Sequence, residues 1–131
     1  MLYIRQTDKS VDQAFQDIQG CIARHGFGLL HHYDFRKTLR DKGFDLDNEC
    51  RVLEVCNPGQ ASEVLHKDMA INMALPCRVS IYQDGGKTFI GMIAPSQLLG
   101  LIADPASLGE VAGQVEATMR AIIDEASGSQ G

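Results

Sequence analysis

Two short segments decide the fold of this chain, Leu53-Glu54-Val55-Cys56-Asn57-Pro58 and Pro76-Cys77-Arg78-Val79. The first predicts the end of a strand and the start of a helix, because asparagine is a favoured N-cap and proline is tolerated at the first helical position. The second opens another apolar strand. Between the two segments, apolar residues at helical spacing predict a short amphipathic helix. The result is a strand–helix–strand unit with a cysteine at the adjoining end of each strand.

Further strands follow on both sides of this unit. Residues 36–48 are polar and are interpreted as a connection, whereas residues 84–87 (DGGK) predict a hairpin turn because glycine accepts a positive φ. Apolar or alternating runs bounded by such turn residues predict strands at residues 2–7, 27–35, 50–56, 76–83 and 88–94.

Two longer helices are predicted from their caps. Ser10, with Gln13 three positions later, predicts an N-cap, and the helix should end near Gly26. The last helix is expected to begin after Asp104, since apolar residues recur every three or four positions from there to residue 126. A short apolar turn or helix is expected at residues 95–102.

The predicted order is strand, helix, four strands, helix. It indicates an α+β two-layer sandwich, with a largely antiparallel five-stranded sheet and the helices on one face. The other sheet face is then open or covered by a partner. The 131 residues are expected to form a single domain, 1–131, with a flexible tail at 127–131.

Composition excludes several classes of protein. A net charge of −5 argues against nucleic-acid binding, which requires a clustered positive surface. No apolar run is long enough for a transmembrane helix, and no secretory signal is visible, so a cytoplasmic location with reduced thiols and no membrane partner is expected. The four cysteines match no common zinc pattern. No dinucleotide fingerprint or catalytic triad can be assembled, so the sequence does not indicate an enzyme.

Side-chain alternation sorts the residues of the two central strands. Cys77 should point toward the helices, while Cys56 and Arg78 should share the opposite, open face. A disulfide between Cys56 and Cys77 is therefore disfavoured, because their Cβ vectors diverge. The Arg78 guanidinium and the start of the following helix would favour the thiolate of Cys56.

The candidate ligand-binding residues all belong to the expected open face. They combine a thiol with charged and aromatic groups, a mixture that suits either a small ligand or a protein partner. One of the adjacent histidines, 31 or 32, is expected to join them, and a metal or haem site would use Cys56 and His32. The set comprises Cys56, Arg78, Glu54, Tyr82, Arg5 and His32, with Tyr3 beside them.

With these residues in place, the chain resembles the bacterial and archaeal family known as domain of unknown function 302. The resemblance implies a fold similar to the TATA-binding-protein-like group, and it implies homodimers, but no activity. The residues that carry it are Leu53-Glu54-Val55-Cys56-Asn57-Pro58, Ala61, Leu65, Leu75-Pro76-Cys77-Arg78-Val79, Tyr82, Asp84-Gly85-Gly86-Lys87 and Pro95.

Three functions remain open from the sequence. The first is a non-enzymatic homodimeric module that binds a small ligand or a partner through the open sheet face around Cys56 and Arg78. The second is a thiol-dependent role in sulfur or redox handling, with Cys56 as the reactive group. The third is haem or metal binding at Cys56 with a histidine. No specific cofactor, ligand or substrate follows from the residues.

Overall fold

A computed structural model describes residues 2–102 and 105–128 of the chain. Strands and helices alternate as far as α3, after which β4 and β5 follow one another, and η1 denotes a 3₁₀ helix. The elements are β1 (Leu2–Thr7), α1 (Val11–Arg24), β2 (Gly28–Asp34), α2 (Phe35–Asp41), β3 (Cys50–Cys56), α3 (Pro58–Lys67), η1 (Met69–Ala74), β4 (Cys77–Asp84), β5 (Lys87–Ile93), α4 (Pro95–Gly100) and α5 (Pro105–Ser127).

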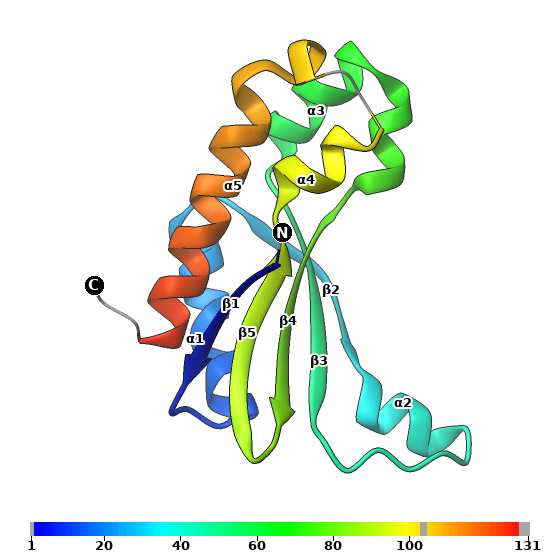
Figure 1. Cartoon of the computed structure of the whole chain (residues 1–131), viewed down its shortest axis with the longest axis vertical. Coiled ribbons are helices and arrows are strands. Elements are labelled where there is room, and N and C mark those ends of the chain that lie inside the picture. Colours follow the sequence, from blue (N-terminus) through cyan, green and yellow to red (C-terminus); the bar gives the residue numbers. More distant parts are fainter. Residues whose placement is uncertain (1, 103–104, 129–131) are drawn as a thin grey trace.

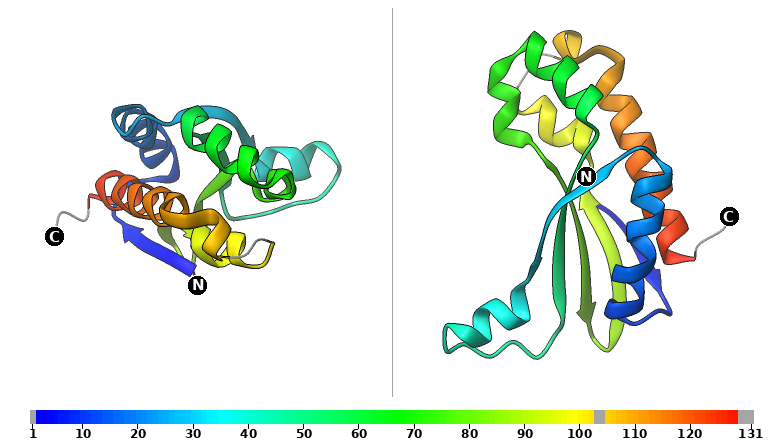
Figure 2. Two further views of the ribbon diagram at one scale, coloured as in Figure 1. Left: turned by 90° about the horizontal axis from the view of Figure 1, so that it is seen from above. Right: turned by 180° about the vertical axis from the view of Figure 1, so that it is seen from behind.

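The strands form a five-stranded antiparallel sheet in the order β1-β5-β4-β3-β2 (Figure 1). Helices α1 and α5 lie side by side against one face of the sheet (Figure 2). Helices α3 and α4, with η1, gather beyond one end of the strands. The expected α+β architecture is confirmed. None of the helices in the described ranges is long and apolar enough to cross a membrane.

The core lies between the sheet and the α1–α5 layer. Ile18 of α1, Leu53 of β3 and Met119 of α5 have no solvent exposure and belong to one apolar cluster. The predicted caps are confirmed: the Ser10 hydroxyl accepts a hydrogen bond from the Gln13 amide at 3.0 Å, and the Asn57 side chain accepts one from the Gln60 amide at 3.1 Å. These caps satisfy backbone donors that the first helical turn leaves unpaired.

Two expectations require correction. The segment interpreted as a connection contains helix α2, which is capped by the Asp34 side chain on the Lys37 amide at 3.1 Å. Helix α2 buries no residue, so its sequence has no apolar stripe from which a helix could be predicted. Helix α5 also continues through Ser127, which is buried, so the expected tail begins later. The expected Asp104 cap and residues 129–131 lie outside the described residues.

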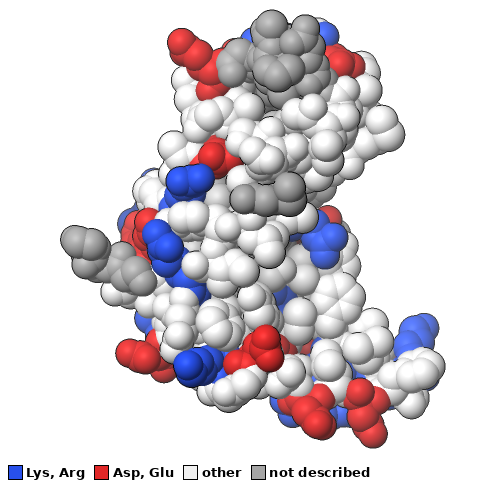
Figure 3. Space-filling model, in the orientation of Figure 1, with Lys and Arg blue, Asp and Glu red and all other residues white. Residues whose placement is uncertain are grey.

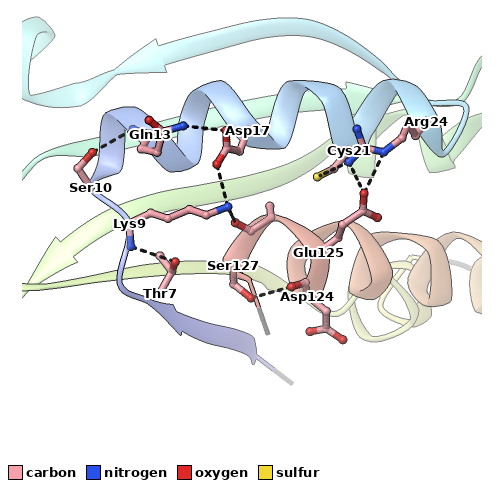
Figure 4. A network of polar contacts seen from close by, with 11 residues as sticks. Thr7, Lys9, Ser10, Gln13, Asp17, Cys21, Arg24, Asp124, Glu125 and Ser127 are labelled. Atoms are coloured by element: carbon pink, nitrogen blue, oxygen red, sulfur yellow. Dashed lines mark hydrogen bonds and ion pairs between the residues drawn. The ribbon is translucent and has the colours of Figure 1, made fainter. Parts of the chain in front are cut away.

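An ion-pair cluster holds α1 against α5 (Figure 4). The Glu125 carboxylate accepts hydrogen bonds from the Arg24 guanidinium and lies 3.0 Å from Nε2 of His25. On the same side, Lys9 Nζ bridges Asp17 of α1 and the Ala126 carbonyl of α5, each at 2.8 Å. The hydrogen bonds from Arg24, and next those from His25, lower the pKa of Glu125 from 4.5 to about 2.

This lowered pKa predicts a pH-dependent loss of stability. The folded pKa of Glu125 lies below its unfolded value, so its contribution is present above about pH 4.3 and is lost as the pH falls toward 2. In thermal melts, wild type should exceed Glu125→Gln in Tm at neutral pH, and this difference should shrink between pH 5 and pH 2. Glu63→Gln, which removes a more distant surface pair with Lys67 at 4.0 Å, is the control and should differ little from wild type. A difference for Glu125→Gln that does not vary with pH would contradict the assignment.

Candidate functional site

The sheet face opposite α1 and α5 carries no helix over its centre, and Figure 1 looks onto it. We call it the open face. Its members alternate with the buried residues of each strand and lie next to one another in the strand register. They are Leu2, Ile4, Gln6, His31, Tyr33, Cys50, Val52, Glu54, Cys56, Arg78, Ser80, Tyr82, Asp84, Lys87, Phe89, Gly91 and Ile93.

The open face is apolar where β1 begins and β5 ends, whereas Gln6 and Lys87 follow on the same face toward the β4–β5 hairpin. Leu2 is 65% exposed, Ile4 38% and Ile93 49%. Gly91, between them, is a close-packed position, since an added Cβ would lie 2.9 Å from the Ile4 side chain and 3.1 Å from the Tyr3 carbonyl oxygen. The surface over the strands is largely uncharged in Figure 3, which has the same orientation. Leu2, Ile4 and Ile93 therefore form a continuous apolar patch at this end of the two strands.

The part of the open face over β2, β3 and β4 combines aromatic, acidic and basic groups. The Tyr33 hydroxyl donates a hydrogen bond to Glu54 at 2.8 Å, and this bond raises the pKa of Tyr33. The Tyr33 ring also stacks on His31 with centroids 6.3 Å apart. Arg78 stands opposite Glu54 in the register, yet no hydrogen bond or ion pair joins its guanidinium to any residue that the structure describes. The face thus offers an unpaired cation.

Tyr82 lies on the open face as expected. It is opposite Cys50 on β3 and Phe89 on β5, and its ring stacks on Phe89 with centroids 5.5 Å apart. Together with Glu54, Cys56 and Arg78, it makes four of the six predicted ligand-binding residues that share this face.

Arg5 and Tyr3 were expected on the open face, and the structure places them on the other side. The Tyr3 hydroxyl donates to Asp124 of α5 at 2.5 Å, and Arg5 Nε donates to the same carboxylate at 3.0 Å. The guanidinium carbons of Arg5 and Arg120 lie 4.5 and 4.9 Å from the Tyr3 ring centroid. At this edge of the sheet, long side chains with polar ends pack under α5, and the purely apolar neighbours of β1 face outward.

His32 was also expected on the open face, and a β-bulge is the reason it is not. The β2–β3 register shifts between Leu29 and His31, so Leu30 is an extra residue. As a result His31 points to the open face, while His32 contacts the Phe15 ring on the α1 side with centroids 4.9 Å apart. Cys56 and His32 are therefore on opposite sides of the sheet. No cluster of three metal-ligating side chains occurs among the residues described.

The thiols are all free, and burial raises the pKa of Cys56. The Arg78 guanidinium does not contribute to the shift in the pKa of Cys56. The structure therefore gives no support to the expectation that Arg78 stabilises the Cys56 thiolate. Cys77 pairs with Val55 on the helix side, where burial raises its pKa to about 11 and the charge of Cys56 adds to the shift. Neither thiol is held as a thiolate at neutral pH.

The raised pKa of Cys56 predicts that its thiol reacts slowly with alkylating agents. Alkylation of Cys56 by iodoacetamide at neutral pH, followed by peptide mass spectrometry, should be slower than alkylation of a free peptide cysteine, because less of the thiol is ionised. Arg78→Gln should leave the rate unchanged. A rate above that of the free peptide would restore a thiol-dependent function to consideration.

The sequence did not reveal that the ends of β3 and β4 open into a cavity beneath α3, α4 and α5. Cys56, Cys77 and Arg78 all contribute to its lining, together with Gln60. The available signal was the position of Gln60, one helical turn before buried Val64 on α3 and therefore on the inward face of that helix.

Comparison with known proteins agrees with this architecture. The family model described as domain of unknown function DUF302 matches residues 3–126. The chain is also similar to a solved structure, the crystal structure of an uncharacterized conserved DUF302 protein from Bacillus stearothermophilus, with 31% sequence identity and a TM-score of 0.90. That match covers 95% of this chain and 97% of the other. No curated protein matches the chain.

Proposed function

Since the chain belongs to the family described as domain of unknown function DUF302, whose description names no activity, we propose a function from its geometry: the domain is a homodimeric binding module in which a second copy covers the open face. One observation carries the proposal. The apolar patch of Leu2, Ile4 and Ile93 is exposed on an ordered sheet, where the edge strand β1 pairs with β5, near the stacked rings of Tyr82 and Phe89. Such a patch is costly to leave in water.

The area of the face suits a second copy of the chain. Five strands about 4.8 Å apart, each six to eight residues long, give a footprint of roughly 24 by 22 Å, or about 500 Å². Two copies would bury about 1,000 Å² in total, which is the area at which specific interfaces begin. A twofold axis through the apolar patch would place the patch of one copy on the patch of the other.

The oligomeric state tests this proposal. Sedimentation equilibrium should find the wild-type chain dimeric in the micromolar range, and Ile93→Glu should make it monomeric, because the interface would bury an unpaired carboxylate. Tyr82→Ala should weaken the dimer by removing the stack on Phe89. Leu101→Glu is the matched control, since Leu101 is 84% exposed and lies beyond α4, away from the open face. A monomeric wild type, or an Ile93→Glu variant that dimerises as tightly as Leu101→Glu, would overturn the proposal.

The alternative functions receive less support. Haem or metal binding by Cys56 and His32 needs two residues that lie on opposite faces of the sheet. A redox role needs an ionised Cys56, whereas burial raises its pKa. Neither is proposed.

A further inference from the structure

The cavity at the end of the sheet is the second feature that the fold leaves unexplained. It has a volume of about 50 Å³. Val55, Val64, Leu99 and Met119 contribute apolar walls from β3, α3, α4 and α5. These walls favour an aliphatic group in the part of the cavity that they enclose.

One polar atom in this apolar lining has no partner. The side-chain oxygen of Gln60, Oε1, is buried, and no donor within the described part of the chain reaches it. The backbone amide of Gln60 is already used, since it donates to Asn57 Oδ1 at 3.1 Å. Buried acceptors are almost always hydrogen-bonded in native proteins. The atom therefore indicates a donor that arrives from outside the chain.

The lining also includes a positive charge. Arg78 contributes to it with a guanidinium that makes no hydrogen bond or ion pair to the described residues. Asn57, the N-cap of α3, belongs to the same lining, so the positive end of that helix dipole adds to the field. An anionic group near Arg78 would be stabilised by both.

The size of the cavity sets the size of its occupant. At about 10–15 Å³ for each water-sized group, a volume of about 50 Å³ admits about four heavy atoms, so it accommodates the short aliphatic chain of a ligand and not the whole of a larger molecule. A haem or a nucleotide does not fit in this space.

We propose that this cavity binds a small carboxylate that carries an N–H or O–H group and a short aliphatic chain. The chain occupies the apolar interior, the donor reaches Gln60 Oε1, and the carboxylate lies toward Arg78. Ile93 belongs both to this lining and to the apolar patch of the open face, whereas Leu2 and Ile4 of the patch do not line the cavity.

Three small molecules of similar shape test the proposed class of ligand. N-Butyrylglycine has all three features, N-butyrylglycinamide lacks the charge, and O-butyrylglycolate replaces the N–H with an ester oxygen. In titrations followed by backbone amide NMR shifts, N-butyrylglycine should bind and shift residues around the cavity. Each analogue should bind about tenfold more weakly, or ~1.4 kcal/mol. Arg78→Gln should abolish the preference for the carboxylate over the amide.

A pair of neighbouring variants on α3 tests the location. Ala61→Leu adds bulk to the cavity lining and should abolish binding, whereas Ser62→Leu changes an exposed position of the same helix and should preserve it. A Leu2→Glu variant changes an exposed residue of the apolar patch that does not line the cavity, so it should bind N-butyrylglycine as wild type does, which separates this proposal from the dimer. The proposal is overturned if N-butyrylglycine shifts no residue of the cavity, if the amide and the acid bind equally, or if Ala61→Leu binds as tightly as Ser62→Leu.

Discussion

Leu53→Ala should lower the free energy of unfolding by about 2–5 kcal/mol, the range for removing a fully buried leucine side chain. Leu53 has no solvent exposure and sits at the middle of β3, beneath α1 and α5. The truncation removes apolar area and leaves a cavity that the surrounding sheet and helices cannot fill. Urea denaturation followed by circular dichroism measures the effect, and the dependence of unfolding on denaturant should not change.

The matched control for Leu53→Ala lies on the opposite face of the sheet. Ile93→Ala, measured in dilute solution where chains are separate, should cost only about 0.5 kcal/mol, because this side chain is 49% exposed. Equal losses for the two variants would mean that the core does not lie on the α1–α5 side alone.

Gln60→Met is expected to stabilise the unliganded chain by about 1–3 kcal/mol, the cost of a buried polar group without a partner. Methionine has a similar length and shape, and it brings no acceptor that must be satisfied. The same substitution should weaken N-butyrylglycine by about tenfold, or ~1.4 kcal/mol, because the ligand N–H loses its acceptor. The two effects have opposite signs, as expected where a binding site carries a local cost in stability.

Thermal unfolding and the NMR titration measure the two effects of Gln60→Met separately. Gln16→Met is the control, since Gln16 is an exposed residue of α1, and it should change stability by no more than about 0.5 kcal/mol. If Gln60→Met destabilises the unliganded chain, the Gln60 amide contributes to folding and its oxygen is not reserved for a ligand.

Local signals predicted most of the fold because they act over a few residues. Ser10, Asn57 and Pro58 fix the starts of two helices, and the two glycines of the β4–β5 hairpin, at φ values of 59° and 78°, allow its turn. Alternation correctly assigned Cys77 to the helix side, opposite Val55. These features need no knowledge of distant parts of the chain.

Some site residues were predicted on the wrong face of the sheet, because their positions depend on contacts that form only in the folded chain. Tyr3 and Arg5 face the helices because Asp124, more than a hundred residues later, receives both side chains. His32 faces α1 because one inserted residue at Leu30 changes the alternation of β2. Neither effect leaves a periodic pattern. The cavity was missed for the same reason, since its walls come from strands and helices that are far apart in sequence.

The extra residue at Leu30 also affects how readily the edge of the sheet can pair with other molecules. β2 is an edge strand, and an uninterrupted edge presents unpaired amides and carbonyls on which strands of other molecules can be templated. The bulge interrupts that template halfway along β2. Deleting Leu30 would regularise the ladder while leaving His32 opposite Leu53 on the helix side, and it would give this edge an uninterrupted row of backbone groups. One irregular position thus makes the β2 edge a poorer template for edge-to-edge pairing than a regular strand would be.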